Sequence, residues 1–155
     1  MIRPATPEDL AALVDLEEAV FTHDRISRRN FRHLLTAANA LSLVDKDRQG
    51  LCGYATLLFN RRSAVARIYS LAVHPRCRGR GLGTKLIAAL EKACRARACT
   101  ALRLEVHPRN AKARRLYKAL GYREFGRYSE YYEDGADAVR MEKTLAPARA
   151  ARRQA

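Results

Sequence analysis

The segment from Arg78 to Gly83, which reads Arg-Gly-Arg-Gly-Leu-Gly, constrains the fold more than any other part of the sequence. It follows an apolar run that ends at Val73, and it leads into Leu86 and Leu90, which have the spacing of one helix face. This pattern predicts a strand, a tight turn and a helix. Glycines let such a turn approach a phosphate closely, and the N–H groups of the turn and of the helix N-terminus attract anions. The sequence therefore predicts an anion-binding turn.

Two other kinds of phosphate-binding turn fit less well. The Walker pattern is excluded because no Gly-Lys-Ser/Thr follows the glycines. A dinucleotide-binding turn of the Rossmann type is disfavoured, because the turn follows predicted antiparallel strands in mid-chain and not the first strand of a strand-helix-strand unit.

Capping residues indicate where helices begin and end. Thr6 followed by Pro7 is typical of a helix start, as are Ser27 and Asn110, and Gly121 is typical of a helix end. The predicted helices run from about residue 7 to residue 21, from Ser27 through Ala38, onward from the glycine turn, and from Ala111 to Leu120.

Alternating apolar residues indicate the strands. In one of them Leu102, Leu104 and Val106 share a face, so that Arg103 and Glu105 point to the other face. The predicted strands are Ile2–Ala5, Leu41–Asp45, 51–59, 64–73, Ala101–Val106, Tyr122–Glu130 and Ala138–Leu145.

The composition is that of a globular protein. Of the 155 residues, 48% are hydrophobic and 30% are charged, which excludes a disordered chain. We expect a single domain over residues 1–145 and a disordered, basic Ala/Arg tail over residues 146–155. No apolar run reaches the roughly 18 to 20 residues that a membrane-spanning helix needs. No membrane partner is therefore expected.

The cysteines give no sign of a metal site. Cys52, Cys77, Cys94 and Cys99 show neither Cys-x-x-Cys spacing nor the density of a disulfide scaffold. We therefore expect reduced thiols, no bound metal and a cytoplasmic location.

Positive charge is concentrated in one part of the chain. The net charge is +14, and residues 76–118 hold thirteen Lys and Arg against only Glu91 and Glu105. Such a field indicates a polyanionic partner, either nucleic acid or a phosphorylated small molecule, although solvated helix faces explain about half of these charges. A nucleic-acid-binding module is an alternative function, but no recognisable motif supports it and it leaves the glycine turn unexplained. Nucleic acid is therefore expected to bind only non-specifically, if at all.

Two blocks of sequence resemble one enzyme superfamily. Leu71-Ala72-Val73-His74-Pro75 followed by Arg78–Gly83 resembles the acetyl-CoA-binding motif Gln/Arg-x-x-Gly-x-Gly/Ala of the GNAT acyltransferases. The segment from Leu104 to Tyr122 matches the distal half of that superfamily in the correct order. The resemblance covers residues 1–145. With the segment Tyr131–Ala138, it is greatest to the ribosomal-protein-alanine N-acetyltransferases and related protein Nα-acetyltransferases.

The resemblance implies both a fold and a reaction. The fold is α/β, with a mixed, mostly antiparallel sheet splayed at its centre by acetyl-CoA and with helices on both faces. The reaction is direct transfer of the acetyl group, in a ternary complex, from the co-substrate acetyl-CoA to the N-terminal α-amino group of a protein. A ribosomal protein is the implied partner.

The resemblance also implies roles for individual residues. Glu105, acting through water, is the general base, and Tyr117 donates a proton to the leaving sulfur. Tyr131 and Tyr132 line a peptide slot. The backbone of Leu71, Ala72 and Val73 pairs with the pantetheine arm, which Asn110 also holds. The remaining cofactor-binding residues are Arg78, Gly79, Arg80, Gly81, Leu82, Gly83 and Thr84, with Arg76, Arg80, Lys112 and Arg115 near the 3′-phosphate.

Each catalytic role has a simpler alternative. Glu105 is also explained as a solvated acid at a strand edge, paired with Arg103 or Arg109. Tyr117 fits a core position, and Asn110 is a good helix cap whatever else it does.

Other side chains give further alternatives. His107 shares the strand face of Glu105 and is a candidate second base. Cys77 is a candidate acyl-enzyme nucleophile. Tyr131 and Tyr132 are also explained as ordinary aromatic strand residues.

The pKa of the acceptor amine favours a protein N-terminus. An α-amino group has an ordinary pKa near 7.7 to 8.0 and a lysine side chain one near 10.4, so deprotonating the lysine at neutral pH costs roughly 3 kcal/mol more. A single carboxylate base therefore suits the α-amine better. Acetylation of a lysine, a small amine or a polyamine, and a catalytically idle acyl-CoA sensor, remain the alternatives.

Overall fold

The computed structural model describes residues 1–146, which form two compact units. Unit 1 comprises residues 1–59 and 69–90, and unit 2 comprises residues 60–68 and those from Glu91 onward. Among the described residues, no helix has both the length and the apolar character needed to cross a membrane. Most of the predicted tail, from residue 147, lies outside the described residues, and the expected single domain stays a prediction.

Unit 1 contains an antiparallel sheet. Strand β1 (Arg3–Pro4) pairs with β2 (Ala40–Asp47), and β2 pairs with β3 (Gly50–Leu58). The unit also contains η1 (Pro7–Asp9), α1 (Leu10–Val20), α2 (Arg28–Thr36), η2 (Pro75–Cys77), the end of β4 (Val65–Val73) and the first turns of α3 (Leu82–Ala96).

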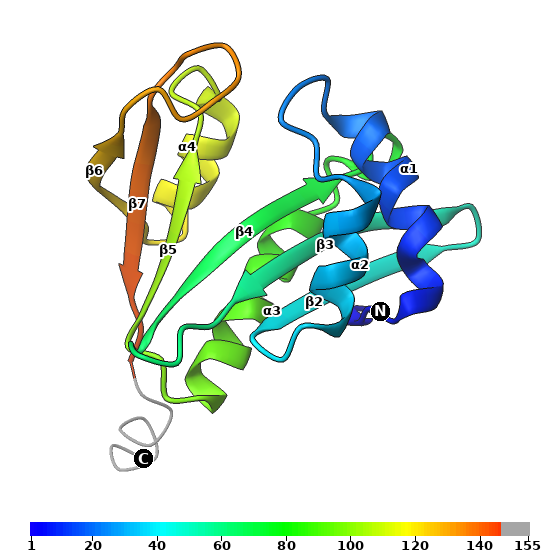
Figure 1. Ribbon diagram of the computed structural model, residues 1–155, viewed down its shortest axis with the longest axis horizontal. Helices are drawn as coiled ribbons and strands as arrows, with labels where there is room; N and C mark the ends of the chain where they lie inside the picture. Colours follow the sequence, from blue (N-terminus) through cyan, green and yellow to red (C-terminus); the bar gives the residue numbers. More distant parts are fainter. Residues whose placement is uncertain (147–155) are drawn as a thin grey trace. The chain divides into compact units, whose positions relative to one another are not determined.

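Neighbouring residues of β3 show that helices cover both faces of this sheet. A Cβ atom added to Gly53 would lie only 3.0 Å from the side chain of Leu82, so α3 packs closely against that face. Tyr54 points to the opposite face, where its ring meets Phe31 of α2 edge-on at 5.6 Å and its hydroxyl donates to Glu17 of α1 at 2.6 Å. The same arrangement is visible in Figure 1. The expectation of helices on both faces is confirmed.

The core of unit 1 encloses one carboxylate. Leu13 and Leu16 of α1 pack with Phe31 and Tyr54, and all four are at most 2% exposed. Glu17 lies among them, and burial raises the pKa of its carboxyl group. Tyr54 donates to one of its oxygens, and a backbone N–H donates to the other at 2.7 Å. These donors compensate for removing the group from water.

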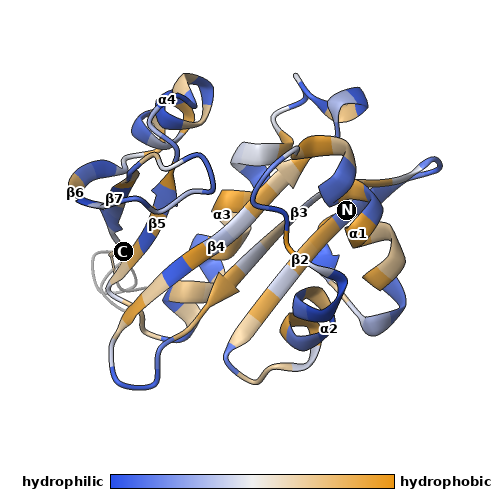
Figure 2. Ribbon diagram, turned by 45° about the horizontal axis from the view of Figure 1, so that its top comes forward, coloured by the Kyte–Doolittle hydropathy of each residue, from blue (hydrophilic) through white to orange (hydrophobic). Residues whose placement is uncertain are grey.

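Unit 2 is a second sheet segment with the last turns of α3 and one complete helix. Strand β5 (Ala101–Val106) runs parallel to the first residues of β4 and antiparallel to β7 (Ala138–Thr144), which pairs antiparallel with β6 (Arg123–Tyr128). The strand order along the chain's sheet is β1-β2-β3-β4-β5-β7-β6, and the sheet is not closed. The predicted mixed, mostly antiparallel sheet is therefore confirmed. Helix α4 (Ala111–Ala119) completes the unit, and most of its ribbon has the colours of hydrophilic residues (Figure 2).

The local signals in the sequence identified several helix ends correctly. The Ser27 hydroxyl accepts the N–H of Asn30 at 3.1 Å, and the Asn110 side chain accepts that of Ala113 at the same distance. Gly121 has a φ of 98°, a left-handed conformation that favours glycine at a helix end.

Candidate active site

The glycine turn in unit 1 has the predicted backbone conformation. Gly79 and Gly81 have φ values of 81° and 74°, and a Cβ atom at either position would meet no atom within 4 Å. Glycine is therefore favoured there by backbone conformation and not by lack of space. Gly83 already belongs to α3, where the Gly81 carbonyl accepts the N–H of Lys85 at 3.1 Å. The turn thus leads directly into a helix N-terminus, as an anion cradle requires.

The other predicted cofactor-binding residues of unit 1 flank this turn. Leu71, Ala72 and Val73 form the end of β4, and the side chain of Ala72 is buried. Arg78 donates from Nε to the Val73 carbonyl at 3.3 Å, which ties the turn back to the strand. Arg80, Leu82 and Lys85 line a cavity of about 520 Å³, and Thr84 is exposed on the first turn of α3.

Arg76, which was predicted to lie near the 3′-phosphate, binds protein groups of unit 1. Its guanidinium donates to Asp47 Oδ2 at 2.6 Å and to the carbonyls of Gly50 and Leu51 at 3.2 and 3.3 Å. These three contacts fix the turn between β2 and β3. Arg76 therefore has a structural role in holding this hairpin.

In unit 2, the predicted base is part of a partly buried ion pair, in which the Arg67 side chain is 37% exposed. The Glu105 side chain is only 5% exposed, and its Oε1 atom accepts from Arg67 Nε at 2.6 Å. The alternative pairing with Arg103 or Arg109 is wrong, because Arg67 is the partner and Arg103 instead donates to Glu142 at 2.5 Å. Both contacts from Arg67 go to Oε1. The other oxygen, Oε2, has no hydrogen-bond partner within residues 1–146.

The sequence analysis missed Arg67, which links two of the predicted site residues. Besides Glu105, it donates to the hydroxyl of Tyr131 at 2.8 Å. Burial opposes the charge of the guanidinium, but Glu105 and Tyr131 outweigh it and raise the pKa of Arg67. A positive charge inside the mostly apolar strand β4 was the available signal, since a charge on a partly buried strand needs a partner.

Tyr131 and Tyr132 lie in the loop between β6 and β7, so their interpretation as strand residues is wrong. Tyr131 stacks on Tyr128 with a centroid distance of 5.8 Å and meets Tyr132 edge-on at 4.9 Å. The ring of Tyr132 lies 4.9 Å from that of His107. We call Tyr128, Tyr131, Tyr132 and His107 the aromatic cluster. Because Tyr131 is 42% exposed and also binds Arg67, this cluster connects solvent with the partner of Glu105.

His107 has contacts at both ring nitrogens. Its Nδ1 accepts the N–H of Arg109 at 3.1 Å, so in a neutral ring the proton is on Nε2. That nitrogen lies 2.7 Å from Asp134 Oδ2. A backbone N–H and His107 together lower the pKa of the Asp134 carboxyl group. With both nitrogens engaged, His107 positions the loop and is a poor candidate for a second base.

Helix α4 carries the remaining predicted residues. Asn110 caps its N-terminus, which confirms the simpler interpretation of this residue without testing its binding role. Tyr117 is 8% exposed and packs edge-on against Tyr122 at 5.6 Å. Burial raises the pKa of Tyr117 to about 12, so its phenol is protonated at neutral pH. Its hydroxyl donates to no other group of the described chain, which leaves the proton available.

The geometry disfavours Cys77 as an acyl-enzyme nucleophile. Its side chain is 1% exposed, whereas a nucleophilic cysteine needs access and a stabilised thiolate. Next to it, burial together with Cys77 and Asp47 raises the pKa of Cys52 to about 12. No disulfide forms among the four cysteines, all of which lie in the described part of the chain.

Comparison with known proteins points to a single family. The sequence matches the acetyltransferase (GNAT) family over residues 10–122. It is 47% identical to an uncharacterised N-acetyltransferase of Methanocaldococcus jannaschii, over 92% of this chain and 90% of that protein.

Two of the relatives and one solved structure are named for their acceptors. A Bacillus subtilis protein provisionally named a ribosomal-protein-alanine N-acetyltransferase is 30% identical over 93% of this chain and 95% of its own. The thialysine N-epsilon-acetyltransferase of Bos taurus is 33% identical over 74% of this chain and 69% of that protein. The crystal structure of the ribosomal-protein-alanine enzyme of Escherichia coli superposes with a TM-score of 0.85, at 26% identity, over 96% of this chain and 95% of that chain.

The Arg67–Glu105 pair gives a prediction about stability. Arg67→Met leaves a buried carboxylate without its cation, and we expect a loss of about 1.5–3 kcal/mol in the free energy of unfolding. Glu105→Gln in the same chain removes the unpaired charge, so the double variant should recover part of that loss. Urea unfolding of the two single variants and the double variant measures the coupling. Arg61→Met, in an exposed turn of the same unit, is the control and should change stability by less than about 0.5 kcal/mol. Strictly additive effects would contradict the pairing.

Proposed function

Because the chain belongs to the acetyltransferase (GNAT) family and is an N-acetyltransferase that uses acetyl-CoA, we propose that its acceptor is the N-terminal α-amino group of a protein. The observation that carries this proposal is the state of Glu105. Arg67 holds one carboxylate oxygen in place, and the other oxygen is not used by any described residue. One oriented carboxylate suits an amine of ordinary pKa near 8 better than a lysine near 10.4.

In the proposed reaction, unit 1 binds the co-substrate. The end of β4, Leu71–Val73, offers backbone groups to the pantetheine arm, and the turn around Gly79 and Gly81 offers N–H groups to the pyrophosphate. Arg80 and Lys85 add positive charge beside the turn. Arg76 is left out of this set because it is committed to Asp47.

Unit 2 supplies the acid and the base. The neutral amine attacks the thioester carbonyl, and the carbon–sulfur bond breaks to release the CoA thiolate. Glu105 accepts the proton of the amine through water, and Tyr117 returns a proton to the sulfur. A phenol with a pKa of about 12 is protonated throughout the neutral range, so its proton is present when the thiolate leaves.

The aromatic cluster is the proposed acceptor surface. Tyr131 and Tyr132 present aromatic rings on a loop held by the bond from His107 to Asp134. Tyrosine rings of this kind bind peptide chains with little loss of conformational entropy. Two relatives or neighbours named as ribosomal-protein-alanine N-acetyltransferases support a ribosomal protein as the substrate. A cytoplasmic location stays a prediction.

A second candidate acceptor is a small molecule with an amine like that of a lysine side chain. The thialysine N-epsilon-acetyltransferase relative favours it. Such an acceptor needs an additional group to lower the cost of deprotonation, which is roughly 3 kcal/mol at neutral pH.

CoA release from acetyl-CoA with a panel of acceptors tests the proposal. The panel contains peptides with free N-terminal Ala, Ser, Met or Gly, the same peptides with blocked N-termini, blocked peptides that contain lysine, and thialysine. Turnover confined to free N-termini is the expected result. Turnover only with blocked lysine peptides or thialysine would overturn the proposed acceptor and favour the second candidate.

Conservative variants of the two catalytic candidates should separate chemistry from binding. Glu105→Gln and Tyr117→Phe each remove one proton-transfer group, so kcat should fall about 100-fold or more while the Kd for CoA stays within a factor of about two. Glu142→Gln is a matched control in the same unit, since it removes another ion-paired carboxylate, and it should retain kcat. Steady-state kinetics and calorimetric CoA titration provide the two readouts. Full activity of both site variants would show that the roles are assigned to the wrong residues.

A further inference from the structure

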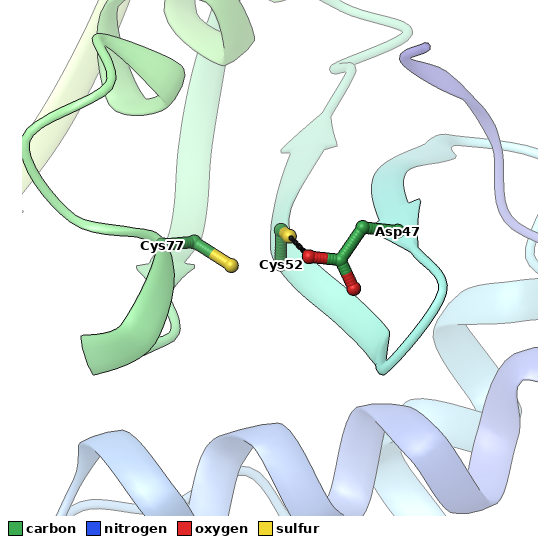
Figure 3. Close-up of side chains that lie close together, drawn as sticks. All are labelled: Asp47, Cys52 and Cys77. Atoms are coloured by element: carbon green, nitrogen blue, oxygen red, sulfur yellow. Dashed lines mark hydrogen bonds between the residues drawn. The ribbon is translucent and has the colours of Figure 1, made fainter.

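Three side chains far from Glu105 in the sequence gather in unit 1. Asp47 ends β2, Cys52 lies on β3 and Cys77 ends the 3₁₀ turn η2. Their two sulfur atoms and one carboxylate oxygen all lie within 4.8 Å of one another. Figure 3 shows the Cys77 sulfur pointing toward Cys52, whose thiol donates to Asp47 Oδ2 at 3.3 Å. No cysteine spacing in the sequence indicates this arrangement.

The donor set matches the preferences of one kind of metal ion. Two thiolates and a carboxylate are ligands that Zn²⁺ accepts in tetrahedral sites, with water able to take the fourth position. Cys94 and Cys99, the other buried cysteines, belong to no such three-donor group within residues 1–146. The third donor, Asp47, therefore distinguishes the pair of Cys52 and Cys77 from the other two cysteines.

Arg76 gives the site a balanced charge. Its guanidinium lies 2.6 Å from Asp47 Oδ2 and 3.8 Å from the Cys52 sulfur. Two thiolates and one carboxylate carry three negative charges, and a divalent ion with Arg76 carries three positive charges. Outer partners that hydrogen-bond to metal ligands in this way orient them. The arginine thus compensates the charge that a divalent ion alone would leave.

The two cysteines are buried, but both border a cavity. Cys52 and Cys77 line the cavity of about 520 Å³ that also borders Arg80, Leu82 and Lys85. A cavity of this volume admits a hydrated ion and leaves room for water as a fourth ligand.

We propose that Asp47, Cys52 and Cys77 bind Zn²⁺, with water from the cavity completing the coordination. The ion replaces the two thiol protons, which pass to solvent. It joins the β2–β3 hairpin to η2, the segment that leads into the glycine turn at Arg78. The site is therefore a structural brace behind the turn that binds acetyl-CoA, and it takes no part in the acetyl transfer.

Zn²⁺ titration of the full chain in competition with a chromophoric chelator, under a non-thiol reductant, tests the proposal. We expect one ion per chain. Cys52→Ser and Cys77→Ser should each weaken binding by at least about 100-fold, since even outer partners of a metal ligand change affinity 10- to 100-fold. The double variant Cys94→Ser, Cys99→Ser is the matched control, because it removes two buried thiols and leaves the three-donor group intact.

A second variant keeps the test decisive if a cysteine variant does not fold. Asp47 is exposed at the end of its strand, and Asp47→Asn removes one ligand while changing the shape of the side chain little. With Co²⁺ as a probe, the wild-type chain should show thiolate-to-cobalt charge-transfer absorption that Cys52→Ser and Cys77→Ser lack and that Asp47→Asn weakens. Circular dichroism identifies variants that fold. Absence of Zn²⁺ binding by the wild-type chain, or binding that these three variants leave unchanged, would overturn the proposal.

Discussion

The ion pair between Arg67 and Glu105 is the interaction on which the candidate site depends. It joins two parallel strands, β4 and β5, at the end of the stretch over which they pair, and it holds one oxygen of a carboxylate that is almost fully buried. A buried carboxylate without a partner is costly, so the charge of Glu105 depends on Arg67. Because Arg67 also binds Tyr131, the same guanidinium sets the position of the loop that carries the proposed acceptor surface.

The proposed binding of the co-substrate depends on a different constraint, the backbone conformation of the glycine turn. Gly79 and Gly81 adopt backbone conformations that other residues avoid, and the turn ends at the start of α3. Arg76 holds the neighbouring hairpin through Asp47, and Cys77 packs under the same segment. The basic residues of this region therefore have separate tasks. Some fix the backbone, and others, such as Arg80, are available to an anion.

Local features of the fold could be predicted from the sequence, and contacts between distant residues could not. The helix caps Ser27 and Asn110, the left-handed Gly121 and the buried face of β5 all follow from short-range rules. The partner of Glu105 is 38 residues away, and its identity depends on the register of two parallel strands, which no local pattern encodes. The proximity of Asp47, Cys52 and Cys77 could not be predicted for the same reason, because it depends on how distant segments pack.

Kinetics of Arg67 variants test the central claim, that a fixed Glu105 is the base, most directly. Arg67→Met should lower kcat with a free N-terminal peptide by about tenfold or more and leave the KM for acetyl-CoA unchanged, because misplacing a catalytic group slows the chemical step. Arg67→Lys should recover part of the loss, since it keeps the charge but not the geometry. A wild-type kcat in Arg67→Met, with the folded structure intact, would contradict the account.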